Sequence, residues 1–94
     1  MAGFTKVPGM DRGDIKVFAL STCGWCRKAK TFLSDNNIGY SYIDIDLLTG
    51  EEMERVREEQ LRYNPAGSFP TIVVDSDYCI VGYDEEKLKD LAGE

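Results

Sequence analysis

The chain has 94 residues, 43% of them hydrophobic, and a formal net charge of −6 from 11 Lys and Arg and 17 Asp and Glu. This length supports one small hydrophobic core, and an acidic chain without a basic stripe argues against nucleic acid and anionic membranes as partners. The apolar runs are too short to cross a bilayer and the N-terminus lacks a signal-peptide core, so we expect a cytoplasmic protein, and we expect a monomer.

Residues 1–14 show no hydrophobic periodicity and include Pro8 and three glycines. We therefore predict a flexible N-terminal arm, followed by a single folded domain over residues 15–94. Residues 15–20 are apolar except for Lys16, which is the pattern of a strand buried on both faces of a parallel or mixed sheet. This strand leads directly into a segment that contains two cysteines.

The segment Cys23-Gly24-Trp25-Cys26 lies where this strand ends and a helical pattern begins. If a helix begins near Cys23, Cys26 lies on the same face three residues later, so a disulfide can form and open without refolding. The free N–H groups and the positive dipole end at a helix N-terminus stabilise a thiolate at Cys23. We predict that Cys23 is the nucleophile and that Cys26, one turn inside the helix, is the resolving thiol.

The residues around this segment favour redox chemistry over metal binding. Arg27, Lys28 and Lys30 add positive charge, which supports a Cys23 thiolate if their side chains lean toward the sulfur. A zinc site needs four Cys or His ligands, but the chain has no His and only Cys79 as a further cysteine, so we expect no metal site. We interpret Cys79 as a buried packing residue, with a regulatory disulfide as the alternative.

The remaining chain alternates between helical and strand patterns. Thr49 and Glu52 have the spacing of a capping box, which predicts the start of a second helix, and Asp84 is the expected N-cap of the last helix. A strand, a helix and another strand in succession indicate a parallel crossover. We predict strands over residues 15–20, 40–45, 70–74 and 78–81 and helices over residues 24–36, 50–62 and 85–91, in the order β-α-β-α-β-β-α.

Over roughly residues 15–92, the chain resembles the glutaredoxin-like proteins of the thioredoxin superfamily. The resemblance rests on Cys23-Gly24-Trp25-Cys26 after the first strand, on Ser68-Phe69-Pro70-Thr71 at the start of the third, and on Val81-Gly82-Tyr83 before the helix at Asp84. It implies a thioredoxin-like α/β fold in which a four-stranded mixed sheet is flanked by three helices. It also implies a cis peptide bond before Pro70, beside the nucleophile, and a Phe69 backbone that pairs with an extended thiol substrate.

Two positions depart from the glutaredoxin pattern. Glutaredoxins commonly carry Lys or Arg three residues before the first cysteine, where it pairs with a carboxylate of glutathione, but this chain has Leu20. They also tend to have Gly-Gly and then Ser/Thr-Asp before the last helix, where this chain reads Val81-Gly82-Tyr83-Asp84-Glu85. Both departures weaken the expected contacts with glutathione.

The dithiol and the resemblance together predict a thiol-disulfide oxidoreductase that reduces protein disulfides or glutathione mixed disulfides. Either glutathione or a reductase of the thioredoxin-reductase type would reset the dithiol, and we expect no tightly bound cofactor. The candidate catalytic residues are Cys23 and Cys26. The candidate substrate-binding residues are Trp25, Arg27, Lys28, Phe69, Pro70, Gly82, Tyr83 and Asp84.

The resemblance also supports a hypothesis of another class, a glutathione-dependent iron–sulfur cluster carrier. As in some glutaredoxins, Cys23 of two protomers and the thiols of two glutathione molecules would hold the cluster. Gly24, in place of the usual Pro after the first cysteine, favours this hypothesis, whereas Leu20 weakens the required glutathione contacts. A redox-inactive adaptor is disfavoured because both thiols are intact.

Overall fold

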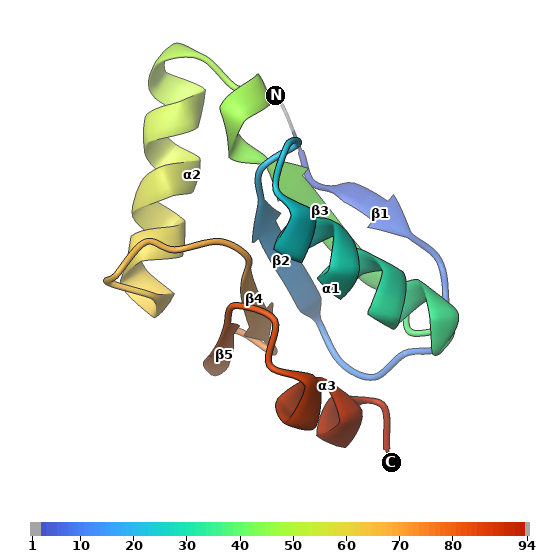
Figure 1. The fold of residues 1–94 in the computed structure, drawn as a ribbon. Helices are drawn as coiled ribbons and strands as arrows, with labels where there is room; N and C mark the ends of the chain where they lie inside the picture. Colours follow the sequence, from blue (N-terminus) through green and yellow to red (C-terminus); the bar gives the residue numbers. More distant parts are fainter. Residues whose placement is uncertain (1–2, 94) are drawn as a thin grey trace.

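The computed structural model describes residues 3–93, which form a central mixed sheet with helices on both faces (Figure 1). The strands are β1 (Thr5–Val7), β2 (Ile15–Ala19), β3 (Tyr40–Asp44), β4 (Thr71–Val74) and β5 (Tyr78–Val81), in the spatial order β1-β3-β2-β4-β5. The helices are α1 (Gly24–Asp35), α2 (Gly50–Tyr63) and α3 (Glu85–Leu91), and a short 3-10 helix, η1 (Ile45–Leu47), follows β3. The order predicted for the elements from residue 15 onward is confirmed, with η1 as an addition.

β2 is the central strand of the sheet. It pairs in parallel with β3, where Val17 lies opposite Tyr42, and antiparallel with β4, where Val17 lies opposite Ile72. Val17, Phe18 and Ala19 are fully buried, which confirms that both faces of this strand are covered. The parallel pairing of β2 and β3 through α1 is the predicted crossover.

Each face of the sheet carries its own hydrophobic cluster, because successive side chains of a strand point to opposite faces. Leu33 of α1 and Leu88 of α3 belong to one cluster, together with Val17. On the other face, Val56 of α2 packs against the cluster that contains Phe18. Figure 1 shows this arrangement, with α1 and α3 on one side of the sheet and α2 on the other. The end of β2 therefore lies between two packed layers.

The predicted four-stranded sheet is corrected to five strands by β1, which lies in the segment predicted to be a flexible arm. β1 pairs antiparallel with β3, with Val7 opposite Tyr40, and the neighbouring Phe4 packs edge-on against Phe18 with 5.4 Å between ring centroids. Three residues are too few to show periodicity, so only the distant partner β3 defines this strand. Residues 1 and 2, also predicted as part of the arm, lie outside the described residues.

The helix starts agree only partly with the predicted caps. Asp84 is the N-cap of α3, where its side chain accepts a hydrogen bond from the Lys87 amide at 3.2 Å. Thr49 is the N-cap of α2 but makes no capping hydrogen bond, so the predicted capping box is incomplete. The chain enters α2 through Gly50 with φ of 60°, a left-handed conformation that differs from a regular first turn. No helix of residues 3–93 is long and apolar enough to cross a membrane.

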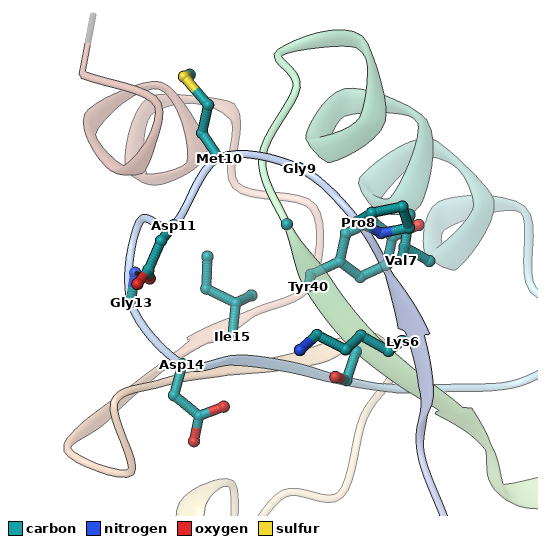
Figure 2. A pocket seen from close by; sticks show the side chains of 12 residues that line it. Lys6, Val7, Pro8, Gly9, Met10, Asp11, Gly13, Asp14, Ile15 and Tyr40 are labelled. Carbon is teal, nitrogen blue, oxygen red and sulfur yellow. Dashed lines mark hydrogen bonds between the residues drawn. The ribbon is translucent and has the colours of Figure 1, made fainter.

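The N-terminal segment encloses a cavity of about 450 Å³, shown in Figure 2. The chain arches around this cavity between Val7 and Asp14, and Tyr40 and Ile15 line it from the starts of β3 and β2. The cysteine segment follows the opposite end of β2. The length of β2 therefore separates this cavity from the two cysteines.

Candidate dithiol site

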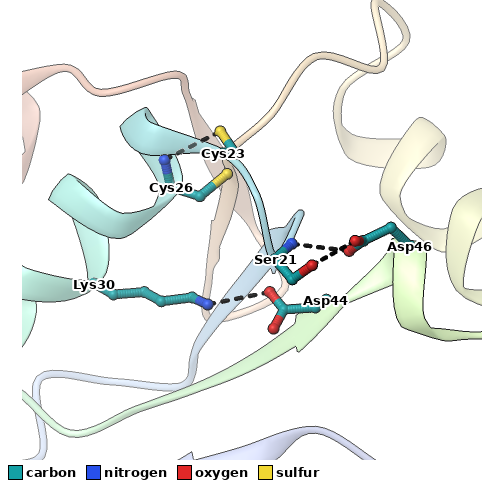
Figure 3. Close-up of polar contacts among 6 residues, drawn as sticks. All are labelled: Ser21, Cys23, Cys26, Lys30, Asp44 and Asp46. Carbon is teal, nitrogen blue, oxygen red and sulfur yellow. Dashed lines mark hydrogen bonds and ion pairs between the residues drawn. The ribbon is translucent and has the colours of Figure 1, made fainter.

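Cys23 and Cys26 lie where the chain leaves β2 and enters α1 (Figure 3). Cys23 is the N-cap of α1, and its Sγ accepts a hydrogen bond from the amide nitrogen of Cys26 at 3.2 Å. Both residues are free thiols, but Cys23 is half-buried whereas Cys26 is fully buried. Cys23 thus lies partly exposed at the helix terminus, and Cys26 lies one turn inside the helix.

Burial controls the ionisation of Cys26. Desolvation raises the pKa of its thiol from 9.0 to about 12, and the hydrogen bond and charge of Cys23 act in the same direction. A hydrogen bond with the Leu20 backbone and the positive charge of Lys30 lower the pKa and partly oppose burial. At neutral pH, Cys26 is therefore a protonated thiol and a poor nucleophile.

Lys30 lies four residues after Cys26 on α1, and hence on the same face of the helix. Its Nζ is 3.1 Å from Oδ1 of Asp44 on β3 (Figure 3). The same Nζ is 4.1 Å from the ring centroid of Tyr42. The two charged side chains are only 22% and 14% exposed. From the sequence, Lys30 is expected among the cations beside Cys23, and no sequence signal points to Asp44 as its partner. The structure instead pairs Lys30 with a carboxylate on the inner face of the helix.

The other two cations lie on the surface beside the dithiol. The Trp25 ring is 59% exposed and stacks on Tyr83, with 6.0 Å between centroids and 28° between planes. Lys28 Nζ lies 5.1 Å from the Trp25 ring centroid and 5.6 Å from that of Tyr83. Arg27 lines a neighbouring pocket of about 450 Å³ with Lys28 and Tyr83. Four of the predicted substrate-binding residues are thus brought together on one surface.

The loop before β4 supplies a further part of the predicted site. The Phe69–Pro70 peptide bond is cis, as the family resemblance implied. The Pro70 carbonyl accepts a hydrogen bond from the Gly82 amide at 2.9 Å, so these two predicted residues are neighbours. Phe69, like Cys23 and Tyr83, packs against the hydrophobic cluster on the α1 face. Asp84 follows this group, and its carboxylate is engaged as the cap of α3.

A buried polar network, which sequence reasoning missed, holds the loop before Pro70. Gln60, Asn64 and Thr71 are at most 3% exposed. All three side chains donate to the Ser68 carbonyl, at 3.0, 3.3 and 2.8 Å respectively. Buried amides and hydroxyls need such partners, and each bond restricts the position of Ser68. The only available sequence signal was one amide residue in a helix otherwise rich in charge and a second amide residue just after that helix, which is too weak to reveal a network.

A second polar contact fixes the loop between β2 and Cys23. The amide nitrogen of Ser21 donates to Oδ1 of Asp46 at 2.8 Å, and the Ser21 hydroxyl donates to Oδ2 at 2.5 Å (Figure 3). These two hydrogen bonds lower the pKa of the Asp46 carboxyl. Because Asp46 lies in η1, the contact ties the cysteine loop to the chain that follows β3.

Cys79 lies apart from the dithiol. It is half-buried and packs against the hydrophobic cluster on the α2 face, whereas Cys26 belongs to the cluster on the α1 face. Its thiol donates to the Tyr63 carbonyl, with 3.1 Å between sulfur and oxygen. These contacts fit a packing residue, although it is less buried than predicted.

The sequence and the fold both match known proteins. The sequence model of the Glutaredoxin family matches residues 15–79. A glutaredoxin-like 8.6 kDa protein in the rubredoxin operon of Clostridium pasteurianum is 30% identical over 77 residues, which cover 82% of this chain and 95% of that protein.

Two solved structures from Methanosarcina have the same thioredoxin-like fold. The methanoredoxin of Methanosarcina acetivorans gives a TM-score of 0.90 at 38% identity, with 99% of this chain and 97% of that chain covered. The glutaredoxin of Methanosarcina mazei Go1 gives a TM-score of 0.89, also at 38% identity, with 99% and 90% covered. With its Cys23–Cys26 pair at the start of α1, the chain belongs to the glutaredoxin family.

Proposed function

We propose that this chain is a dithiol thiol-disulfide oxidoreductase in which Cys23 attacks and Cys26 resolves. The observation that carries the proposal is the half-buried Cys23 sulfur at the N-terminus of α1, which accepts the amide hydrogen bond of a fully buried Cys26. An N–H donor and the positive end of the helix dipole both stabilise negative charge on that sulfur. Cys23 is therefore the sulfur that is placed to attack a substrate disulfide.

The reaction transfers two electrons in two displacement steps. The Cys23 thiolate attacks one sulfur of the substrate disulfide, forms a mixed disulfide with it and releases the other sulfur as a thiolate. The Cys26 thiol then loses its proton and attacks the Cys23 sulfur. The second substrate sulfur leaves as a thiolate, which water or the released proton neutralises, and the protein keeps a Cys23–Cys26 disulfide. An external thiol or a reductase returns the two electrons to the protein.

The high pKa of Cys26 fits this order of events. In the reduced protein Cys26 stays protonated, because burial and the neighbouring Cys23 raise its pKa to about 12. Once Cys23 is bonded to the substrate it carries no negative charge, so one of the influences that raise the Cys26 pKa disappears. The cation of Lys30 continues to favour a Cys26 thiolate. Formation of the mixed disulfide thus activates the resolving thiol.

Substrate binding is proposed on two sides of Cys23. On one side, Trp25, Tyr83 and Lys28 form an exposed aromatic surface with a cation over both rings, and Arg27 lies beside it. On the other, the backbone of Phe69 before Pro70 would pair with an extended segment of a client protein. This arrangement favours protein disulfides. Glutathione mixed disulfides are the weaker substrates, because Leu20 cannot pair with a carboxylate.

The decisive experiment offers the oxidised protein two reducing systems in parallel, glutathione with its reductase and NADPH with a thioredoxin reductase. The reduced protein is then given a protein disulfide, such as insulin, and a glutathione mixed disulfide. We expect reduction of insulin, with faster recycling by the reductase than by glutathione. A protein that reduces neither substrate is not an oxidoreductase of this kind.

The iron–sulfur alternative uses the same Cys23 sulfur and can be separated from this proposal by colour. A cluster shared by two protomers would give visible absorbance and a dimer after anaerobic purification with glutathione. We expect a colourless monomer whose two thiols are free to react.

A further inference from the structure

A third pocket, of about 390 Å³, lies on the side of the dithiol that faces α2. Its apolar lining comes from Leu20, Ile45, Met53 and Phe69. Leu20 is three residues before Cys23, and Phe69 directly precedes Pro70, so the pocket borders both segments that flank the reactive sulfur. We call it the Leu20–Met53 pocket.

The charged residues around the pocket do not favour an anionic ligand. Asp46 and Glu54 line it, against a single cation, Arg57. The Arg57 guanidinium is already engaged: one nitrogen donates to Gln60 Oε1 at 2.7 Å and to the Gly67 carbonyl at 3.2 Å. Its central carbon also lies 5.2 Å from the Phe69 ring centroid. A ligand carboxylate would therefore meet two like charges and a cation that already donates two of its five N–H groups.

The hydrogen bonds of Asp46 keep its negative charge in place beside the pocket. Both oxygens of Asp46 accept from Ser21, and these bonds lower the pKa of the carboxyl, so it remains ionised at neutral pH. The same bonds fix the loop that carries Leu20 toward Cys23. The apolar lining, by contrast, offers contact to any uncharged group placed there, because apolar surface gains free energy on leaving water.

We propose that the Leu20–Met53 pocket is a side-chain subsite for protein disulfides, which takes a large apolar residue within two positions of the attacked client cysteine. This inference rests on the proposed function. The support for it is that Phe69 lines the pocket, so an extended segment paired to the Phe69 backbone would run along the edge of the pocket. Alternate side chains of such a segment point to the same face, so one of them can enter the pocket. The excess of carboxylates makes a free acidic thiol compound the disfavoured occupant.

The test uses short peptides joined into symmetric dimers through a single cysteine, so that attack on either sulfur gives the same products. One set carries Leu at one of the two positions before or after the cysteine, and a matched peptide carries Ser at all of them. The second-order rate of oxidation of the reduced protein is measured in a single turnover by acid quenching and mass spectrometry. We expect at least one Leu peptide to react about tenfold faster than the Ser peptide.

A matched pair of variants ties this preference to the pocket. Met53 and Leu61 are both on α2 and are 37% and 36% exposed, but only Met53 lines the pocket. Met53→Lys should bring the Leu and Ser peptides within about twofold of each other, whereas Leu61→Lys should keep the preference. Because both changes add one positive charge to the same helix, a general electrostatic effect would appear in both variants.

The outcomes separate this proposal from the one on which it rests. If none of the disulfide-linked peptides oxidises the reduced wild-type protein, the proposed function fails. If it reacts with all peptides at the same rate, or if Met53→Lys slows the Leu and Ser peptides equally, disulfide reduction stands and the subsite is overturned. A preference that Leu61→Lys also removes overturns the subsite as well.

Discussion

The amide nitrogen of Cys26 lies 3.2 Å from the Sγ of Cys23, so the backbone of Cys26 holds the Cys23 sulfur while the Cys26 side chain stays buried. Helix caps of this kind usually use oxygen, and here sulfur takes that place at the N-terminus of α1. The same contact anchors the reactive sulfur and orders the first turn. Substitutions of the two cysteines should therefore have different consequences.

Cys23→Ser should abolish disulfide reduction, because no other accessible thiol occupies the helix terminus. Cys26→Ser should still form a mixed disulfide with the client and should trap it, since no resolving thiol follows. Mass spectrometry after mixing with insulin detects the adduct. Cys79→Ser is the matched control and should retain wild-type activity, because Cys79 lies on the other face of the sheet. Equal loss in both dithiol variants without any adduct would contradict the division of roles.

The buried thiol of Cys26 should make the protein sensitive to alkaline pH. Its folded-state pKa of about 12 exceeds the value of 9.0 for a free thiol, so the unfolded chain releases this proton first as the pH rises. Between these two pH values a rise in pH therefore favours unfolding, and the free energy of unfolding should fall by roughly 1–2 kcal/mol from about pH 8 to about pH 10. Urea unfolding at both pH values measures this change in unfolding free energy.

Cys26→Ala is the control for this alkaline effect, because other groups also titrate in the same range. The wild type should lose roughly 1–2 kcal/mol more of its unfolding free energy than Cys26→Ala between the two pH values. Equal losses in the two proteins would show that Cys26 ionises in the folded state as easily as in the unfolded chain.

Lys30 should matter for the second step of the reaction and for stability. Lys30→Met removes the cation that lowers the Cys26 pKa, so the mixed disulfide should resolve more slowly while its formation is unchanged. It also leaves the Asp44 carboxylate, only 14% exposed, without its ammonium partner. We expect a loss of about 1–3 kcal/mol in unfolding free energy. Rapid-mixing kinetics with a quench separates the two steps.

A second substitution distinguishes the charge effect from simple loss of packing. The double variant of Lys30→Met and Asp44→Asn should recover part of the stability, because no uncompensated carboxylate remains, but its resolving step should stay slow. Lys89→Met, which removes an exposed lysine of α3, should change neither quantity. A resolving rate that recovers with stability would mean that Lys30 acts only through structure.

Leu20→Lys should raise the affinity for glutathione mixed disulfides. The new ammonium lies beside the dithiol and can pair with a carboxylate of glutathione, and one charge-assisted hydrogen bond is worth about 1.5–3 kcal/mol, or roughly ten- to a hundredfold in affinity. The structure adds a competitor, because Asp46 and Glu54 line the same pocket and will attract the new lysine. We therefore expect the lower end of that range.

Steady-state kinetics with a glutathionylated peptide and with insulin checks the Leu20→Lys prediction. KM for the glutathionylated peptide should fall by about tenfold, with little change toward insulin. If the wild type already handles the glutathionylated peptide as well as the variant, other cations such as Arg27 or Lys28 supply the anchor and glutathione is a regular substrate.

The features that the sequence predicted best were those with local signals. The buried run of β2, the cysteine spacing and the Asp84 cap each depend on residues within one element, and the structure has all three. The cis bond before Pro70 came only from family resemblance, because no periodic pattern encodes a peptide isomer.

The features that escaped prediction depend on partners far along the chain. Lys30 is at a helix position that could serve several neighbours, and only the parallel pairing of β2 and β3 brings Asp44 to it. Gln60 lies on a helix rich in charge, where a polar residue is expected to face solvent. It is buried instead, with the Ser68 carbonyl of a later loop as a hydrogen-bond partner. The β1 strand has the same origin, since its hydrogen bonds with β3 define it more than its own residues do.

β1 shields the outer edge of β3. Residues 40–42 of β3 pair with β1 on their outer side, so their backbone groups on that side do not offer a template for another chain. A protein shortened to residue 15, where the match to the family begins, would leave the outer side of β3 open to a strand from a second molecule. The short N-terminal strand thus replaces the longer open edge of β3 with an edge of only three residues, and very short edge strands offer little template for pairing with another chain.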